Sequence, residues 1–206
     1  IETLGKYEIR RVLGRGSAGT VLEGWDPAIR RRVAIKTVRI VDATDPDIEE
    51  QIGRFRREAQ AAGRLIHPSI VTVHDYGETE EVAYIVMEFV EGPSLRTFLD
   101  KRQPAALEDT VRIMEDVLAG LEFSHERGIV HRDIKPANVM LTSHDLGRAR
   151  AKIADFGIAR FENSGLTMAQ TVLGTPMYMA PEQFVGRAID HRVDLADHGF
   201  AEGVGK

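Results

Sequence analysis

The sequence contains no cysteine, which excludes disulfide bonds and thiolate metal sites. Aromatic residues make up only 6% of its 206 residues. No apolar run reaches the ~18 residues that a membrane-spanning helix needs. Basic residues are not in excess, since 27 Lys and Arg stand against 32 Asp and Glu, for a net charge of −5. Nucleic acids select basic faces, so we expect no nucleic-acid partner.

What is present is the composition of a folded globular protein, with 43% hydrophobic and 29% charged residues. The chain begins at Ile1 and shows no charged-then-apolar leader. We therefore expect a piece of a longer protein with a cytoplasmic location. The parent protein would remain free to carry a membrane anchor in a segment absent from this chain.

Most of the first ninety residues have the pattern of β-strands. Alternating and β-branched residues predict strands over 7–13, 20–25, 32–40, 71–76 and 82–89. One helix interrupts them, from Asp45 to about Leu65, with His67-Pro68 expected to end it. Its apolar stripe consists of Ile48, Ile52, Phe55, Ala59 and Ala62.

The pattern becomes helical after a linker at 91–94, where we place a domain boundary. A helix is predicted over 108–127, with Gly128 as its C-terminal cap. Its buried stripe is expected to consist of Val111, Met114, Leu118 and Leu121. Short apolar stretches follow at 129–130, 139–141 and 152–154.

A glycine-rich turn over 14–21 fits the pattern G-x-G-x-x-G-x-V. Glycines allow backbone amides to approach phosphate oxygens without a Cβ in the way. A plain hairpin turn and a dinucleotide-binding turn are alternatives. The second requires a helix after the turn, and the strand-like residues from Thr20 onward count against it.

Lys36 lies in the strand sequence Val-Ala-Ile-Lys, 36 − 19 = 17 residues after the last glycine of the turn. A strand lysine usually belongs to a solvated face, but this one is a candidate for gripping nucleotide phosphates. Glu58, on the following helix, is its candidate anionic partner.

The strongest single signal is the sequence HRDIKPAN at 131–138. It places a carboxylate, an ammonium group and a carboxamide within eight residues of a proline-containing loop. Asp133 is suited to accept a proton from an attacking hydroxyl, and Lys135 to neutralise charge on a phosphoryl group. Asn138 offers a hard oxygen ligand for Mg²⁺.

Two weaker motifs follow: DFG at 155–157 and APE at 180–182. Taken alone, each is compatible with an ordinary turn or helix start. Together with the glycine-rich turn, the strand lysine, the helix glutamate and the HRD loop, they stand in the order found in protein kinases. From about Tyr7 to Asp194 the chain resembles the protein kinase family. Lys135 and the short loops resemble the bacterial eukaryotic-like serine/threonine kinases.

The resemblance implies an α+β, two-lobed kinase fold over residues 1–206. Residues 1–90 would form a β-rich, ATP-binding N-lobe with one main helix. Residues 91–206 would form a mainly helical C-lobe that is incomplete. The implied cofactors are ATP and Mg²⁺ (or Mn²⁺), and the implied substrates are proteins with serine or threonine hydroxyls. A homodimer through the N-lobe is a further expectation.

The resemblance also implies a role for each matching residue. Asp133 would be the catalytic base, Lys135 would assist the γ-phosphate, and Lys36 paired to Glu58 would hold the α- and β-phosphates. Asn138 and Asp155 would hold the metal, and Thr167 or Thr171 would be autophosphorylated in an activation loop at 158–179. Thr175 would contact Asp133 and Lys135. The residues implied to surround ATP are Leu13, Gly14, Gly16, Gly19, Val21, Ala34, Lys36, Met87, Glu88 and Val90.

Two other function classes remain to be weighed. An inactive, nucleotide-binding module usually lacks the lysine or one of the two aspartates, and all three are present here. A small-molecule phosphotransferase typically lacks the APE segment. The tail after Asp197 departs from the family pattern, because Asp197, Glu202 and Gly203 suit a buried helix poorly. We therefore expect the 206-residue chain alone to be poorly folded in its second half and nearly inactive.

Overall fold

The computed structural model describes residues 3–16, 19–40, 45–102, 104–156, 178 and 190–195. The chain divides into two compact units. One consists of Ile1–Ile66 with Thr72–Phe89, and the other of His67–Val71 with Val90–Lys206. The short segment His67–Val71 therefore belongs to the second unit, although it lies within the sequence of the first.

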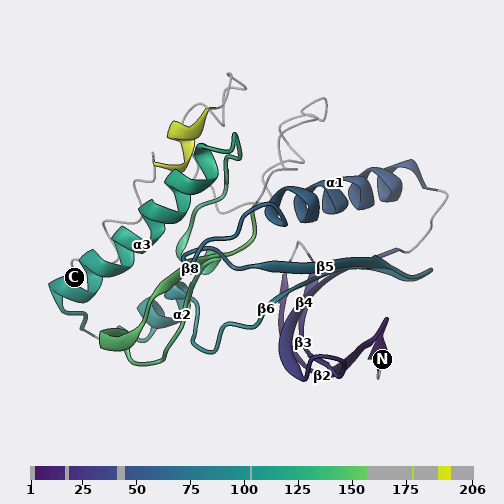
Figure 1. Ribbon diagram of the computed structural model, residues 1–206, viewed down its shortest axis with the longest axis horizontal. Coiled ribbons are helices and arrows are strands. Elements are labelled where there is room, and N and C mark those ends of the chain that lie inside the picture. Colours follow the sequence, from purple (N-terminus) through teal and green to yellow (C-terminus); the bar gives the residue numbers. More distant parts are fainter. Residues whose placement is uncertain are drawn as a thin grey trace. The chain divides into compact units, whose positions relative to one another are not determined.

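The first unit is built on a six-stranded sheet in which every neighbouring pair is antiparallel. Figure 1 shows that the sheet is strongly curled. The strand order is β1-β2-β3-β4-β6-β5, so the predicted glycine-rich turn joins neighbouring strands as a hairpin. The strands are β1 (Thr3–Leu4), β2 (Tyr7–Gly16), β3 (Gly19–Asp26), β4 (Arg31–Arg39), β5 (Val73–Glu78) and β6 (Val82–Glu88).

The two faces of this sheet bury different sets of apolar residues. On one face Val33, Ile35 and Val86 pack with residues of β1 and β2. On the other face Val38, Ala83 and Ile85 pack against helix α1 (Pro46–Ala62). The alternation of side chains along a strand produces this division, because neighbours in sequence point to opposite faces.

Helix α1 has the predicted start and the predicted apolar stripe, but it ends earlier than expected. The Asp45 side chain accepts a hydrogen bond from the Asp47 backbone N–H, and Phe55, Ala59 and Ala62 are buried. The helix ends at Ala62 rather than near Leu65, because the chain tightens after Gly63. The Leu65 backbone N–H bonds to the carbonyl of Ala62, three residues back, and the Leu65 side chain is fully buried.

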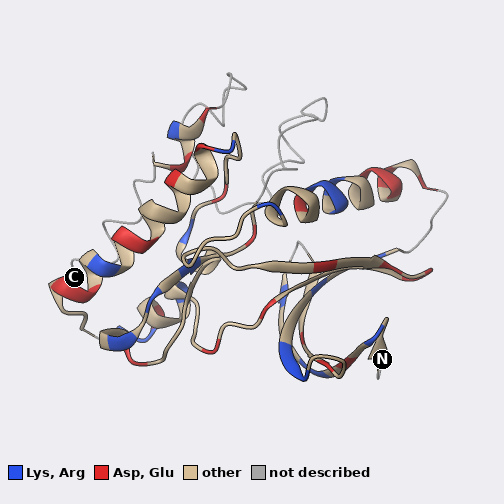
Figure 2. Ribbon diagram, viewed as in Figure 1, with Lys and Arg blue, Asp and Glu red and all other residues tan. Residues whose placement is uncertain are grey.

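Charge along α1 follows the direction of the helix. Asp47 and Glu49 lie in its first turn, where the helix dipole favours negative charge. Figure 2 shows acidic residues at this end and basic residues on the following turns.

The predicted strand at 71–76 is shifted in the structure. Strand β5 begins at Val73, whereas the backbone N–H of Val71 bonds to Ile153 O in the second unit. Val71 is buried there rather than in the first sheet.

The second unit combines helices with a small two-stranded sheet. Helices α2 (Leu95–Asp100) and α3 (Leu107–His125) are followed by β7 (Val139–Leu141) and β8 (Ala151–Ile153), which pair antiparallel. Three short 3₁₀ turns complete its described part: η1 (Pro136–Asn138), η2 (Leu146–Arg148) and η4 (His191–Asp194). Among the described residues of both units, no helix has the length and apolar character to cross a membrane.

The predicted buried stripe of α3 is wrong in two of its four positions. Val111 is 47% exposed and Leu118 48% exposed. The buried face lies elsewhere on the helix and includes Ile113, Asp116, Val117, Gly120, Leu121 and Ser124. Asp116 is accepted there because Arg150 and the Ala151 backbone N–H bond to its carboxylate.

The end of α3 also differs from the prediction. The helix stops at His125 with Glu126 as its C-terminal cap. Gly128 lies two residues further on, at a left-handed φ of 71° that glycine adopts without strain.

Candidate active site

Lys36 and Glu58 form an ion pair within the first unit. The Nζ atom of Lys36 lies 2.9 Å from Oε1 of Glu58, and the two side chains are only 8% and 16% exposed. The pair forms because Lys36 lies on the α1 side of strand β4, two residues from Val38 in the core beneath that helix. Burying the ammonium group would be unfavourable without this partner. The contact that we expected from the sequence is therefore present.

Several other residues predicted to contact the nucleotide lie in the central strands β3, β4 and β6 of the first unit. Val21 is paired with Lys36, and Ala34 with Met87. Gly19 has a left-handed φ of 116°, and a Cβ there would collide with the backbone oxygen of Thr37. The remaining predicted residues lie in the β2–β3 hairpin (Leu13, Gly14 and Gly16), at the end of β6 (Glu88) and at the start of the second unit's main segment (Val90).

In the second unit, Asp133 lies at the centre of a polar cluster. Its Oδ2 atom accepts hydrogen bonds from Lys135 Nζ at 2.8 Å and from Asn138 Nδ2 at 3.0 Å. Asn138 Nδ2 also donates to the backbone oxygen of Asp133, at 2.8 Å. The side chains of Asp133 and Lys135 are mostly buried, at 14% and 16% exposed. The structure thus brings together the three residues that the sequence motif nominated.

His131 is a buried, neutral imidazole that contacts the backbone of Asp133. Its Nε2 atom lies 2.9 Å from the carbonyl oxygen of Ala154, which can only accept, so Nε2 carries the proton. Its Nδ1 atom accepts from the backbone N–H of Asp133 at 3.2 Å. Burial lowers the pKa of His131, against the opposing effect of the Asp194 carboxylate. Phe156, also buried, packs on the imidazole with ring centroids 4.7 Å apart.

Asp194 fixes the backbone of the loop that precedes Asp133. Its fully buried carboxylate accepts from the backbone N–H groups of His131 (2.8 Å) and Arg132 (2.6 Å). A third bond joins it to Nε2 of His125, at 2.7 Å. Arg132 has a left-handed φ of 67°, a strained conformation for a residue with a side chain, and the carboxylate holds it there. The sequence motifs did not indicate the role of His125.

Asn138 and Asp155 have the chemistry of a hard-cation site. The amide nitrogen of Asn138 is used in bonds to Asp133, which leaves its oxygen as the atom to offer a metal. The Ala154 backbone N–H bonds to the backbone oxygen of Asn138, so Asp155 follows at the same end of the β7–β8 pair. One amide oxygen and one carboxylate fit Mg²⁺ or Mn²⁺, which retain waters and bind phosphate oxygens. Asp155 has a left-handed φ of 59°.

The part of the chain that the structure describes contains no group of three or more His, Cys, Asp or Glu side chains suited to a metal ion. An Asn–Asp pair is a different kind of site. Several predicted residues fall outside the described residues: Gly157, the activation loop with Thr167, Thr171 and Thr175, and the APE segment at 180–182.

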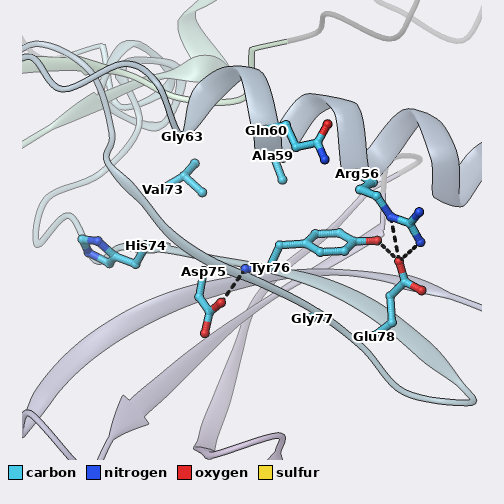
Figure 3. A pocket seen from close by; sticks show the side chains of 10 residues that line it. All are labelled: Arg56, Ala59, Gln60, Gly63, Val73, His74, Asp75, Tyr76, Gly77 and Glu78. Atoms are coloured by element: carbon cyan, nitrogen blue, oxygen red, sulfur yellow. Dashed lines mark hydrogen bonds and ion pairs between the residues drawn. The ribbon is translucent and has the colours of Figure 1, made fainter.

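A surface cavity of about 620 Å³ lies in the first unit between α1 and β5, and none of the predicted site residues lines it. Figure 3 shows Arg56, Tyr76 and Glu78 converging at one end. Arg56 Nη2 lies 2.6 Å from Glu78 Oε1, and the Tyr76 hydroxyl donates to the same oxygen. Burial, followed by the bond to Glu78, raises the pKa of Tyr76 to about 12. The positive charge of Arg56 is thus balanced by the negative charge of Glu78.

Comparison with known proteins agrees with this arrangement of residues. The model of the family described as the protein kinase domain matches residues 7–200. The chain belongs to the protein kinase domain family. A probable serine/threonine-protein kinase of Streptomyces coelicolor is 46% identical over 202 residues, which cover 95% of this chain. Serine/threonine-protein kinase PknB of Mycobacterium leprae is 40% identical and that of Mycobacterium tuberculosis 41% identical, each covering 94% of this chain.

These relatives are much longer than the chain. The matched region makes up 29% of the Streptomyces protein and 31% of each mycobacterial one. The α+β content, with a curled antiparallel sheet and one helix in the first unit, is that of a protein kinase fold. Members of this family use ATP and a divalent metal ion.

Proposed function

We propose that this chain supplies the catalytic residues of an ATP-dependent protein serine/threonine kinase. The observation that carries the proposal is the Asp133 cluster, in which one mostly buried carboxylate is bonded to both Lys135 and Asn138. The Lys36–Glu58 pair supports it independently, because it supplies a fixed cation for nucleotide phosphates.

The proposed reaction is an in-line transfer of the γ-phosphoryl group. The hydroxyl oxygen of a substrate serine or threonine attacks the γ-phosphorus, and the bond from that phosphorus to the β–γ bridging oxygen breaks, releasing ADP. Asp133 orients the hydroxyl and accepts its proton. Lys135 balances the charge of the transferred group, and Lys36 holds the α- and β-phosphates. The protein contributes positioning and charge rather than a covalent intermediate.

Asn138 and Asp155 would hold the metal ion, with Mg²⁺ or Mn²⁺ as candidates. A divalent ion bound there would neutralise charge on the β- and γ-phosphate oxygens. The left-handed backbone of Asp155 and the amide orientation of Asn138 support these assignments.

Further parts of the proposal concern the whole protein. Autophosphorylation at Thr167 or Thr171, a homodimer through the first unit and a cytoplasmic location of the catalytic part all remain predictions. Sedimentation of the full-length protein tests the dimer. A membrane anchor elsewhere in the parent protein would be compatible with all three.

The test is phosphate transfer from labelled ATP by the full-length protein, offered protein and small-molecule acceptors in parallel. We expect labelled serine or threonine in protein, and loss of labelling on chelation of divalent metal. Asp133→Asn should lower turnover by at least ~10²-fold, the scale of a positioned general base. Asp145→Asn is the matched control, because Asp145 is exposed and its side chain contacts only residues of the η2 turn among the contacts described, as its cap and as the ion-pair partner of Arg148. Transfer to small molecules alone, or equal turnover in the two variants, would contradict the proposal.

A further inference from the structure

Three charged side chains form a network across neighbouring strands of the first sheet. Glu23 on β3 lies directly opposite Arg11 on β2 and diagonal to Arg32 on β4. Arg11 Nε donates to Glu23 Oε2 at 2.7 Å, and Arg32 Nε donates to Glu23 Oε1 at 3.0 Å. Each carboxylate oxygen thus receives its own guanidinium group. None of the motifs identified in the sequence includes these residues.

Glu23 is the fixed centre of the network. Its side chain is 6% exposed, whereas that of Arg11 is 64% exposed and that of Arg32 33%. Burial alone would raise the pKa of Glu23, yet the hydrogen bonds from Arg11 and Arg32 hold it below its usual value. A buried carboxylate is retained in a sheet only when such partners satisfy it. The consequence for Arg32 is a guanidinium group held in one position.

Besides its bond to Glu23, the guanidinium group of Arg32 stacks on the ring of Phe89. The guanidinium carbon lies 3.9 Å from the centroid of the Phe89 ring, a close cation–π contact. Val33 pairs with Glu88, so Arg32 and Phe89 are the next positions along β4 and β6, where the strand pairing ends. Phe89 is therefore the first residue after β6, which ends at Glu88.

Glu88, the residue before Phe89, is anchored by Thr72, which lies just before strand β5. The Glu88 backbone N–H bonds to Thr72 O at 2.9 Å, and the Glu88 carboxylate accepts from the Thr72 backbone N–H at 3.3 Å. Glu88 is thus held by Thr72, and Phe89 is held by the stacked Arg32.

We infer that Arg32, fixed by Glu23 and Arg11, is a positioning residue that holds Phe89, next to Glu88, for binding the nucleotide base. The inference rests on the proposed function and on the expectation, implied by the family resemblance, that Glu88 and Val90 lie around the bound ATP. Arg32 also lies two and four residues before Ala34 and Lys36, on the same face of β4. A segment held in its binding geometry before the ligand arrives loses less conformational freedom on binding. Losing Arg32 should therefore weaken ATP binding and leave the phosphoryl-transfer step nearly unchanged.

The experiment measures ATP affinity and steady-state kinetics in the full-length protein carrying Arg32→Ala. We expect the Kd and the KM for ATP to rise about five- to tenfold, the scale of a partly desolvated cation–π contact, with kcat within about twofold. Adenosine used as a competitor should lose affinity by the same factor, because the effect acts on the base and not on the phosphates.

Arg10→Ala is the matched control. Arg10 stacks on Trp25, the cross-strand partner of Arg32, at 4.4 Å, so this variant removes the same kind of contact from a neighbouring position without removing the one to Phe89. We expect its ATP affinity to equal that of the wild type. Phe89→Leu should reproduce the loss, and Arg32→Ala added to Phe89→Leu should have little further effect, since both remove one contact.

Arg11→Ala controls for misfolding, because the Arg11 side chain is largely exposed. Its removal affects Arg32 through their shared partner Glu23. We expect a two- to threefold rise in Kd for ATP, in the range of a weakened ion-pair network. Equal Kd values for the Arg32→Ala and Arg10→Ala variants, multiplicative effects of Arg32→Ala and Phe89→Leu, or a loss confined to kcat would each overturn the inference. A wild-type protein that binds ATP but transfers no phosphate would instead contradict the proposed function.

Discussion

Replacing Asp194 by asparagine removes one negative charge and one acceptor from a fully buried position. The carboxylate currently accepts three hydrogen bonds, from the backbone N–H groups of His131 and Arg132 and from the ring of His125. Asparagine has one oxygen, so its NH₂ group must face at least one buried N–H donor. The variant is nearly isosteric, and its effect therefore measures charge and hydrogen bonding rather than packing.

The expected loss of stability follows from those three bonds. A hydrogen bond to a charged group contributes ~1.5–3 kcal/mol, and a buried donor left without a partner costs ~1–3 kcal/mol. An asparagine oxygen in the place of Oδ2 would keep weakened bonds to His131 and His125, while the NH₂ group would leave the Arg132 backbone N–H unsatisfied. The free energy of unfolding should then fall by ~3–5 kcal/mol. Turnover should fall as well, on the order of 10²-fold, because the loop positions Asp133 two residues after His131.

Urea and thermal unfolding of the full-length protein, together with turnover at saturating ATP, test this reasoning. Asp190→Asn is the control: Asp190 lies four residues earlier, is exposed, and its side chain bonds only to residue 192 among the contacts described. We expect its midpoint and turnover to match the wild type. If the two variants unfold at the same midpoint, the carboxylate of Asp194 does not hold the loop as we describe.

Three further predictions concern other parts of the site. Lys36→Met should abolish phosphate transfer, and adding Glu58→Gln should lower the residual turnover little further, which a double-mutant cycle tests. Additive losses of turnover would show that the two residues act independently. Because the pKa of His131 is lowered in the folded protein, the unfolded chain binds more protons below about pH 6.5, and stability should fall there by up to ~1.4 kcal/mol per pH unit. Urea unfolding between pH 7.5 and 5.5 should show a shallower pH dependence for His131→Phe, and an unchanged slope would exclude His131 as its source. Phosphopeptide mapping of active protein should find phosphate on Thr167 or Thr171, and active protein modified at neither would rule out both sites.

Local sequence predicted that Asp133, Lys135 and Asn138 lie together, because they are close along the chain. Asp133, Lys135 and Asn138 lie within six residues, and a short turn suffices to bring their side chains together. The Lys36–Glu58 contact spans 22 residues, but a strand and the helix that follows it fix its geometry. In both cases the residue types and their spacing carry the information.

The buried face of α3 could not be predicted in the same way. The apolar pattern pointed to Val111 and Leu118, which are about half exposed. The true face includes Asp116 and Gly120, whose burial depends on distant partners. Arg150 neutralises Asp116 from 34 residues away, and a Cβ on residue 120 would come within 3.0 Å of Ser69 O and of a side chain on β8. Residue type alone gives no signal for such partners.

Contacts that join distant segments were missed for the same reason. His125 and Asp194 are 69 residues apart, and neither belongs to the 131–138 motif whose backbone Asp194 holds. No motif in the sequence included Arg32 or Glu23. Only the register of β3 and β4, with Glu23 opposite Ala34, brings the carboxylate beside Arg32.

The segment His67–Val71 has a consequence for how the protein is made. It emerges from the ribosome before the last two strands of the first sheet, but its own partners come much later: the backbone N–H of Ile153 bonds to Ser69 O, and that of Val71 to Ile153 O. During synthesis the first sheet can form with β5 and β6 before Ile153, the partner of this loop, has been made about 80 residues later. A gene fragment starting at Val90 would lack the loop altogether. Supplying residues 67–71 as a peptide in trans should then protect the Ile153 amide from hydrogen exchange.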